Sequence, residues 1–285
     1  MIHVLPDVRE LLTPHRVRPG TPEVIEQRLQ RTGLIVLEGL TSRAAVLDLA
    51  SRVMTITPHR DSDIDGLTTL RDTGRHEQRA GYAGFTGTEL APHTERSGIP
   101  VPPRLMLLVC GRPAGQGGEC LLTDGRSVYD GLFINHWKAA HALSQPRTAF
   151  FGGGVGAGSG HPGQVFAARP DGRVSVRLRL DGLARWSPLV QPYLGALRAA
   201  AVAHQLRLRL AVGQGYLLDN TRWLHARAAF TGDRLCWRAL GEPTFSLLPG
   251  FVPDLQSGTA AGASRSDGST PIHSGLVHGW PNSRS

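Results

Sequence analysis

The stretch GYLLDNTRWLHARAAFTGDRLCWRAL, residues 215–240, decides the fold class. It opens with a short apolar run (215–220), passes a polar turn, and closes with a second apolar run (234–240). Short apolar runs bounded by turn residues predict β-strands rather than helices. A single histidine, His225, follows the turn after the first run. The stretch therefore predicts two strands with a histidine presented between them, although a lone histidine is also common in a core or at a cap.

Two arginines of the second run, Arg234 and Arg238, lie four residues apart. Side chains at even spacing face the same side of a strand, so both guanidinium groups are expected on one face. Guanidinium groups on an apolar strand need anions, and a dicarboxylate ligand would supply one. The alternative is a row of surface arginines on an edge strand, because arginine is rarely fully buried.

A second histidine stands beside a carboxylate in His93-Thr94-Glu95. In a strand, residues two apart share a face, so this pair can present an imidazole and a carboxylate to one metal ion. Two histidines and one carboxylate form the facial triad of non-haem Fe(II) oxygenases, which leaves coordination positions open. The same donors also suit zinc, although the chain contains no HExxH motif. Without a metal, the pair would be a polar loop in which Arg96 neutralises Glu95.

The remaining pattern alternates short strands with a few helices. Helices are predicted at 21–33, 42–53 and 189–206, strands at 34–40, 104–110 and 118–125, and a hairpin at 165–178 around Pro170-Asp171-Gly172. This order predicts a mainly β fold with flanking helices, arranged as an antiparallel double-sheet barrel. One domain is expected over residues 1–255, and residues 256–285, rich in Ser, Gly, Thr and Ala, are expected to form a flexible tail.

Composition narrows the possible partners. The formal charge is +8, but the arginines are scattered and Lys138 is the only lysine, so we expect no nucleic-acid partner. No apolar run approaches the roughly 18 residues that span a bilayer, and the N-terminal segment is not typical of a secretion signal. Three widely spaced cysteines argue against a disulfide framework and for the cytoplasm. The sequence does not determine the oligomeric state.

Three segments together resemble the taurine dioxygenase-like and clavaminate synthase-like family of 2-oxoglutarate-dependent oxygenases. They are PHTER (92–96), PPRLMLLVCGRPAGQGGECLLTDGRSVYDGL (102–132) and the stretch 215–240. The resemblance implies a double-stranded β-helix, or jelly roll, which uses Fe(II), 2-oxoglutarate and O2. It implies His93, Glu95 and His225 as the iron ligands and catalytic centre.

The resemblance also implies roles for three further residues. Arg234 takes the position that binds the distal carboxylate of 2-oxoglutarate, and Arg238 takes a position that contacts the cosubstrate or an acidic substrate. Cys120 stands where many relatives carry a threonine that holds 2-oxoglutarate, and a thiol is a weaker hydrogen-bonding group. Halogenating members of related families lack the carboxylate ligand, so Glu95 favours hydroxylation or desaturation.

The expected substrate is a small molecule, an amino acid or a natural-product intermediate that can carry a carboxylate. The polar, Gly-rich segment 58–90 is expected to form a lid or substrate wall. Tyr82, Phe85 and Thr86 are candidate substrate contacts, with ordinary packing as the alternative reading of the aromatic pair. Two other functions stay open: a non-catalytic jelly-roll binding protein and a zinc-dependent hydrolase. The sequence does not name the substrate or the position oxidised.

Overall fold

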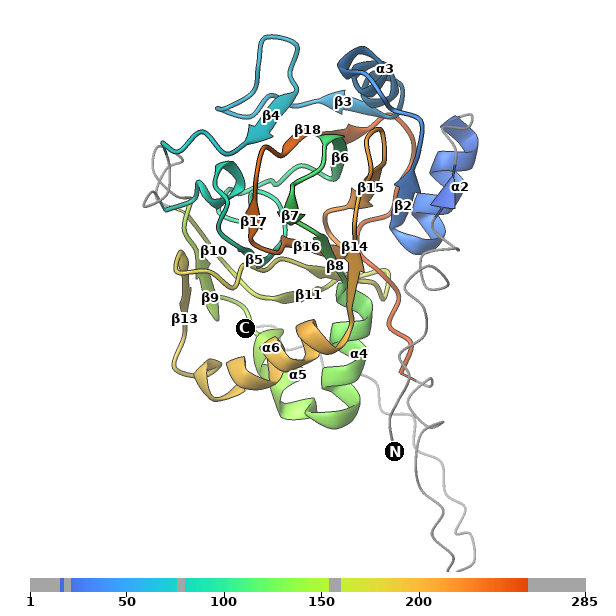
Figure 1. Ribbon diagram of the computed structural model, residues 1–285. Helices are drawn as coiled ribbons and strands as arrows, with labels where there is room; N and C mark the ends of the chain where they lie inside the picture. The colour runs from blue at the N-terminus through green and yellow to red at the C-terminus, as the bar shows by residue number, and fades with distance from the viewer. Residues whose placement is uncertain (1–15, 18–21, 76–79, 154–159, 256–285) are drawn as a thin grey trace, which may run out of the picture.

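The computed structural model describes residues 16–17, 22–75, 80–153 and 160–255. The predicted tail, 256–285, lies outside these residues. The largest sheet has seven strands in the order β1-β2-β15-β6-β18-β3, with β4 paired to β18 beside this path (Figure 1). Its strands are β1 Arg16–Val17, β2 Leu34–Leu37, β3 Met54–Ile56, β4 Thr68–Arg71, β6 Leu105–Arg112, β15 Gly215–Asp219 and β18 Leu235–Pro243.

The central strands of this sheet send alternate side chains into two different cores. In β6, Leu107 and Val109 belong to the outer core, which lies between this sheet and two helices. Leu108 and Cys110 belong to the inner core, which lies between this sheet and a second sheet. Because both faces are covered, residues 105–110 of β6 and 215–218 of β15 are unbroken apolar runs rather than an apolar–polar alternation.

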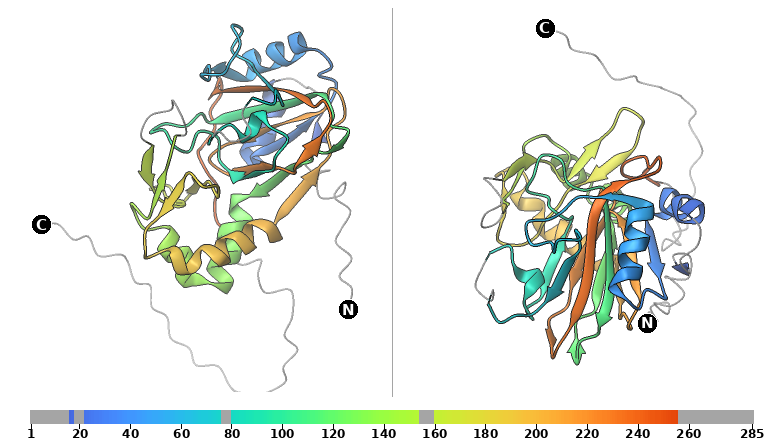
Figure 2. Two further views of the ribbon diagram at one scale, coloured as in Figure 1. Left: turned by 60° about the vertical axis from the view of Figure 1, so that its left-hand side comes forward. Right: turned by 90° about the horizontal axis from the view of Figure 1, so that it is seen from above.

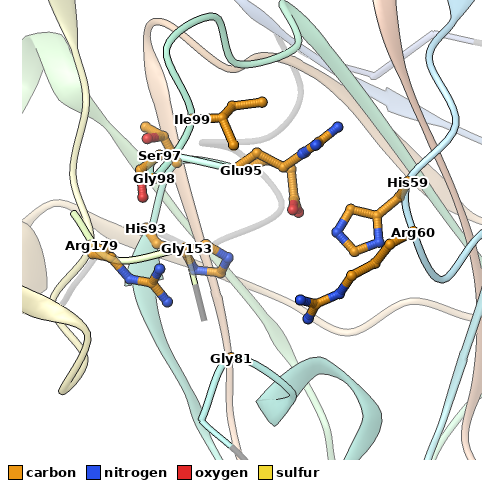
Figure 3. A pocket seen from close by; sticks show the side chains of 12 residues that line it. His59, Arg60, Gly81, His93, Glu95, Ser97, Gly98, Ile99, Gly153 and Arg179 are labelled. Atoms are coloured by element: carbon orange, nitrogen blue, oxygen red, sulfur yellow. The ribbon is translucent and has the colours of Figure 1, made fainter. Parts of the chain in front are cut away.

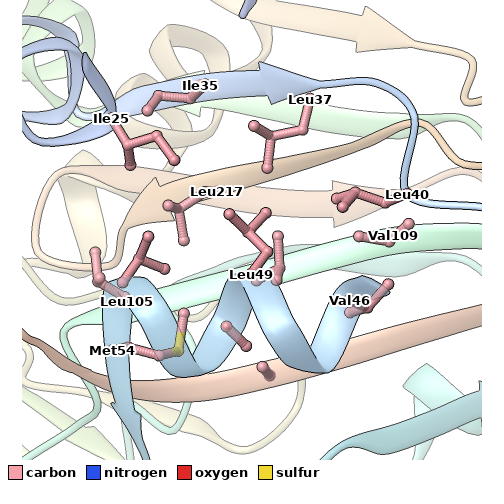
Figure 4. Close-up of a cluster of buried hydrophobic side chains, with 14 of the residues drawn as sticks. Ile25, Ile35, Leu37, Leu40, Val46, Leu49, Met54, Leu105, Val109 and Leu217 are labelled. Carbon is pink, nitrogen blue, oxygen red and sulfur yellow. The ribbon is translucent and has the colours of Figure 1, made fainter. Parts of the chain in front are cut away.

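Two helices build the outer core. They are α2 (Pro22–Thr32) and α3 (Arg43–Val53), in agreement with the helices predicted at 21–33 and 42–53. Figure 4 shows Leu49 of α3 directed toward Leu217 of the sheet and Val46 of α3 on the side of Val109. All four side chains are fully buried. The helices therefore cover the face of the large sheet that is directed away from the second sheet.

The second sheet packs against the inner face of the first. Its order is β14-β8-β16-β5, with bounds β5 Leu90–His93, β8 Cys120–Asp124, β14 Gln205–Leu208 and β16 Trp223–Arg227. Cys120, Leu122 and Trp223 from this sheet share the inner core with Leu108 and Cys110 from the large one. The two sheets thus face each other, and the chain motifs at 92–96 and 223–227 lie on the smaller sheet.

A third core closes the outer side of the smaller sheet. It is formed by α4 (Gly125–Asn135), α5 (Trp137–Leu143) and α6 (Leu194–Ala203), together with the hairpin β11 (Phe166–Ala168) and β12 (Val174–Val176), and it includes Leu224 of β16. Figure 2 shows these helices well apart from α2 and α3. The remaining elements are η2 Ala83–Phe85, β7 Gln116–Gly117, β9 Ala149–Phe151, β10 His161–Gly163, β13 Ala184–Trp186, η3 Gln191–Tyr193 and β17 Phe230–Thr231.

The mainly β fold with few helices is confirmed, and so is the hairpin at 165–178. The predicted helix at 189–206 is too long: Gln205 and Leu206 belong to β14 because they pair with β8. The sequence prediction lacked α4 and α5 altogether. It also lacked β4, which lies within the segment 58–90 and pairs with β18. None of the helices in the described part of the chain is both long and apolar enough to cross a membrane.

Candidate metal centre and its cavity

His93 and His225 are direct neighbours across two antiparallel strands. The register pairs His225 of β16 with His93 of β5, and the ring centroids lie 4.1 Å apart. β5 is the outermost strand of its sheet, and the pairing with β16 is irregular just before His93, where Pro92 lacks a backbone N–H. Strand pairing therefore joins two histidines that are far apart in the sequence.

Glu95 reaches the same place from outside the strand. β5 ends at His93, so the expectation that a continuous strand carries the whole H-x-E motif is wrong. The backbone of Glu95 is instead held by Asn220. The Glu95 N–H donates to Asn220 Oδ1 at 2.6 Å, and Asn220 Nδ2 donates to the carbonyl of Glu95 at 3.0 Å. The turn that precedes His225 thus also fixes Glu95.

The three side chains form a compact donor set. One ligand atom from each of His93, Glu95 and His225 lies within 4.8 Å of the others, and these are the residues that meet this condition in the described part of the chain. His93 Nδ1 lies 2.8 Å from the carbonyl of Ala91, which leaves Nε2 as its ligand atom. His225 Nε2 lies 3.6 Å from Glu95 Oε2. Two imidazoles and one carboxylate in this arrangement fit the facial triad that holds Fe(II).

The charge states also fit a metal centre. Burial lowers the pKa of His93 to about 3, with a further contribution from His225, so the imidazole is neutral at pH 7. Burial alone would raise the pKa of Glu95, but Arg238 and the two histidines outweigh it and hold that pKa well below its usual value. A neutral imidazole and an ionised carboxylate are the forms that bind metal, so at pH 7 neither His93 nor Glu95 must lose a proton first.

Replacing Asn220 by aspartate should disturb this centre without removing a ligand. Asn220 Nδ2 donates to the carbonyls of Glu95 and Pro103, and a carboxylate would face both with acceptors alone. We expect Fe(II) affinity to fall by about 10- to 100-fold, as for other residues that orient metal ligands. Competition with a chelating dye measures the affinity. Asn135→Asp, at an exposed amide, is the control, and equal affinities for the two variants would contradict the role of Asn220.

Arg234 and Arg238 face the space between the two sheets. Both line a cavity together with Glu95, His225 and Cys120. Arg234 is 6% exposed, and β18 lies between β6 and its other partners, β3 and β4, so the alternative of surface arginines on an edge strand is wrong. The even spacing along β18 places Arg238 on the same face as Cys236 and Leu240, which belong to the inner core.

The two arginines differ in their partners. Arg238 Nη1 donates to Glu95 Oε2 at 2.8 Å, so Arg238, rather than Arg96, is the ion-pair partner of Glu95. Within the described residues, Arg234 has no carboxylate partner; its Nη2 lies 3.9 Å from Cys120 Sγ. A buried guanidinium without an anion is costly. This unmatched charge, in the cavity that Glu95 and His225 line, fits the distal carboxylate of 2-oxoglutarate.

A second cavity opens on the other side of the triad (Figure 3). It is lined by His93, Glu95 and Arg96, and, across from them, by His59 and Arg60. Burial, assisted by Arg238, lowers the pKa of His59 to about 4, so this ring is neutral at pH 7. Its Nδ1 accepts from the Asp61 N–H at 3.2 Å, which leaves Nε2–H as a donor. His59, Arg60 and Gly81 of segment 58–90 thus line this cavity, and the role of the segment as a lid or substrate wall stays a prediction.

The three candidate substrate contacts, Tyr82, Phe85 and Thr86, pack against other side chains or backbone beside the cavities. Tyr82 is 8% exposed and lies under the Arg60 guanidinium, 4.5 Å from its ring centroid. Phe85 packs on the inner core, and Thr86 Oγ1 donates to the Ala83 carbonyl at 3.1 Å. Two neighbouring glycines do line cavities. Gly81 lines the second cavity, with His59, which we call the outer cavity; Gly84 lines the first, with Arg234, which we call the inner cavity. The role of Tyr82, Phe85 and Thr86 as substrate contacts stays a prediction.

Sequence reasoning did not identify His59, Arg60, Asn220 or Arg227. His59 and Arg60 lie in a segment without a period, so no pattern marks them. Asn220 was assigned to the end of the predicted strand 215–220, with no role at the metal centre. For Arg227 a signal was available: it lies two residues after His225 in a strand, so the two side chains share a face. Arg227 lines the inner cavity.

Comparison with known proteins gives a family match. The model of the family described as "Taurine catabolism dioxygenase TauD, TfdA family" matches residues 9–240. No curated protein sequence matches the chain. Among solved structures, an asparagine oxygenase in complex with Fe(II), hydroxyasparagine and succinate gives a TM-score of 0.64 at 19% identity, covering 77% of each chain.

Two other oxygenases have a similar fold. The non-haem iron oxygenase OrfP, in complex with Fe, succinate and (3S)-hydroxy-L-Arg, gives a TM-score of 0.62 at 13% identity, covering 78% of this chain and 80% of that one. PvcB from Pseudomonas aeruginosa gives a TM-score of 0.58 at 14% identity, covering 77% and 79%. It is described as an Fe, alpha-ketoglutarate-dependent oxygenase from an isonitrile synthetic pathway.

Proposed function

The chain belongs to the taurine catabolism dioxygenase TauD, TfdA family, and on this premise we propose that it is an Fe(II)- and 2-oxoglutarate-dependent dioxygenase. The observation that carries the proposal is one cavity that joins the two buried members of the triad, Glu95 and His225, to the unmatched guanidinium of Arg234. When bound, iron, 2-oxoglutarate and O2 supply an oxidant that removes hydrogen from a substrate, with succinate and CO2 as by-products.

We propose the following roles for the residues around the centre. His93, Glu95 and His225 hold the iron, and Asn220 fixes the backbone of Glu95. Arg234 binds the distal carboxylate of 2-oxoglutarate, and Cys120 lines the same end of the cavity. Arg238 keeps Glu95 ionised; its buried Nε has no partner within the described residues, so it can also contact the cosubstrate or an acidic substrate.

We propose that the two sheets form a double-stranded β-helix, in a single domain that ends near residue 255. The shared inner core between the sheets and the cavity between them support this arrangement. The three cysteines are all buried and unbridged, which agrees with the expected reducing cytoplasm.

The outer cavity supports a small substrate that carries an acidic group. Arg60 and Arg96 line it, and within the described residues Arg96 has no carboxylate partner. Arg96 also has φ of +53°, a left-handed conformation that is uncommon for a non-glycine residue. The asparagine oxygenase and OrfP, which have a similar fold, have structures in complex with hydroxyasparagine and hydroxyarginine, respectively. We therefore propose an amino acid or a natural-product intermediate with a carboxylate as the substrate class.

An anaerobic titration followed by oxygen tests the function. Fe(II) and then 2-oxoglutarate should produce a charge-transfer absorption band in the wild-type protein. Oxygen should then yield succinate, with more succinate when a substrate from a panel of L-asparagine, L-arginine, L-aspartate and L-glutamate is present. Mass spectrometry should show a product heavier by one oxygen or lighter by two hydrogens.

The same experiment separates the alternatives. A protein that binds Fe(II) but never converts 2-oxoglutarate to succinate would be a binding protein and would refute the dioxygenase. Hydrolytic turnover with Zn(II), in the absence of 2-oxoglutarate, would favour the zinc hydrolase.

A further inference from the structure

Arg227 is a buried cation that binds no carboxylate in the described part of the chain. It ends β16, two residues after His225, and is 5% exposed. Its Nη2 donates to three main-chain carbonyls: Thr86 at 2.8 Å, Ala83 at 3.2 Å, and Thr88. Its guanidinium also lies over the Phe230 ring, 4.7 Å from the centroid. One side chain of β16, the strand that carries His225, therefore contacts three main-chain carbonyls of a separate segment.

That segment, residues 83–88, has little regular structure to hold it. It contains the three-residue turn η2, in which the Phe85 N–H donates to the Tyr82 carbonyl. Its ties to neighbouring chain include the Gly87 N–H to Asp72 Oδ2 at 2.7 Å and the Phe230 N–H to the Gly87 carbonyl at 2.9 Å. A three-residue turn outside the two sheets is the kind of element that opens before the central strands.

The segment also borders the cavity of the metal centre. Gly84 and Leu90 line this cavity together with Glu95, His225 and the three arginines 227, 234 and 238. Arg227 Nε is buried and has no partner within the described residues. If Arg227 served packing alone, an apolar side chain would do so without burying a charge. The structure instead places a cation where it fixes one wall of the cavity.

We propose that Arg227 is a positioning residue: it holds segment 83–88 against the strand that carries His225, and so closes the cavity around 2-oxoglutarate. The part concerning 2-oxoglutarate rests on the proposed dioxygenase function; the attachment of the segment does not. Arg227 donates to three carbonyls from one nitrogen that has two hydrogens, whereas a lysine ammonium has three. Lysine should therefore replace Arg227 in part, although its side chain is shorter.

Hydrogen exchange on the metal-free protein tests the attachment. In Arg227→Met, which keeps an apolar stem and removes the donors, the amides of Phe85, Thr86 and Phe230 should exchange about 10- to 100-fold faster. Amides of the central strand β6 should keep their wild-type rates, and Arg227→Lys should restore most of the protection. Arg71→Met, which removes an exposed arginine from the neighbouring strand β4, is the matched control and should change nothing.

Cosubstrate binding tests the consequence. Arg227→Met should raise the dissociation constant for 2-oxoglutarate about tenfold, with Fe(II) affinity within about twofold of wild type and partial recovery in Arg227→Lys. Unchanged exchange in 83–88, or faster exchange throughout the sheets, would overturn the attachment. Faster local exchange with an unchanged dissociation constant would overturn the positioning role. A wild-type protein that never forms succinate would refute the dioxygenase instead, and exchange alone would then decide the attachment.

Discussion

His225→Ala should abolish Fe(II)-dependent formation of succinate. The substitution removes one of three donor atoms that lie within 4.8 Å of one another, and it does not touch the ion pair between Glu95 and Arg238. Losing a residue that merely orients a metal ligand costs about 10- to 100-fold in affinity or activity. Losing a ligand should therefore reduce Fe(II) affinity by more than about 100-fold.

Two measurements keep this expectation separate from misfolding. The melting temperature of the metal-free variant should stay close to that of metal-free wild type, because His225 already borders a cavity and its truncation enlarges an existing space. His204→Ala, at an exposed imidazole at the end of α6, should keep wild-type Fe(II) affinity and turnover. Full turnover by His225→Ala would contradict the assignment of His225 as a metal ligand. Full turnover by His93→Ala or Glu95→Ala would contradict the assignment of that residue in the same way.

Arg234→Ala should raise the requirement for 2-oxoglutarate steeply. Arg234 is 6% exposed and finds no carboxylate partner within the described residues, so a cosubstrate carboxylate would complete a buried, charge-assisted pair. Breaking such a pair costs about 3–5 kcal/mol. This corresponds to a dissociation constant higher by roughly two to three and a half orders of magnitude.

Side-chain geometry gives the control for Arg234. Arg234→Lys should recover only part of the affinity, because an ammonium cannot reproduce the planar fork of arginine. A 2-oxo monoacid such as pyruvate should bind the wild type poorly and lose little more in Arg234→Ala. Anaerobic titration of the charge-transfer band measures each constant. An unchanged constant for Arg234→Ala, together with a large change for Arg238→Ala, would transfer the role to Arg238.

The sequence by itself identified the central strands β6, β15 and β18 and the candidate ligands. Residues 105–110 and 215–218 are apolar without interruption because both faces of the large sheet are covered, and such runs are recognisable without a structure. The period of two in the predicted strand 234–240 put Arg234 and Arg238 on one face. The types of side chain in H-x-E and in the stretch around His225 pointed to a metal.

The sequence did not reveal the helical layer over the smaller sheet. Helix α4 contains Gly125 and Gly131, and His136 separates it from α5, which weakens the helical signal of this stretch. Gln205 and Leu206 of β14 were assigned to the helix predicted at 189–206, and only their pairing with β8 makes them part of a strand. Local propensity is a weak signal when tertiary pairing decides the outcome.

Only the tertiary structure decided how the centre is assembled. Register places His93 opposite His225, and Asn220 brings Glu95 to them after β5 has ended. The partner of Glu95 is Arg238, from the other sheet, rather than its sequence neighbour Arg96. Burial then makes His93 neutral, while Arg238 and the histidines keep Glu95 ionised. Side-chain chemistry is written in the sequence, but distances, burial and charge state depend on which distant strands pack together.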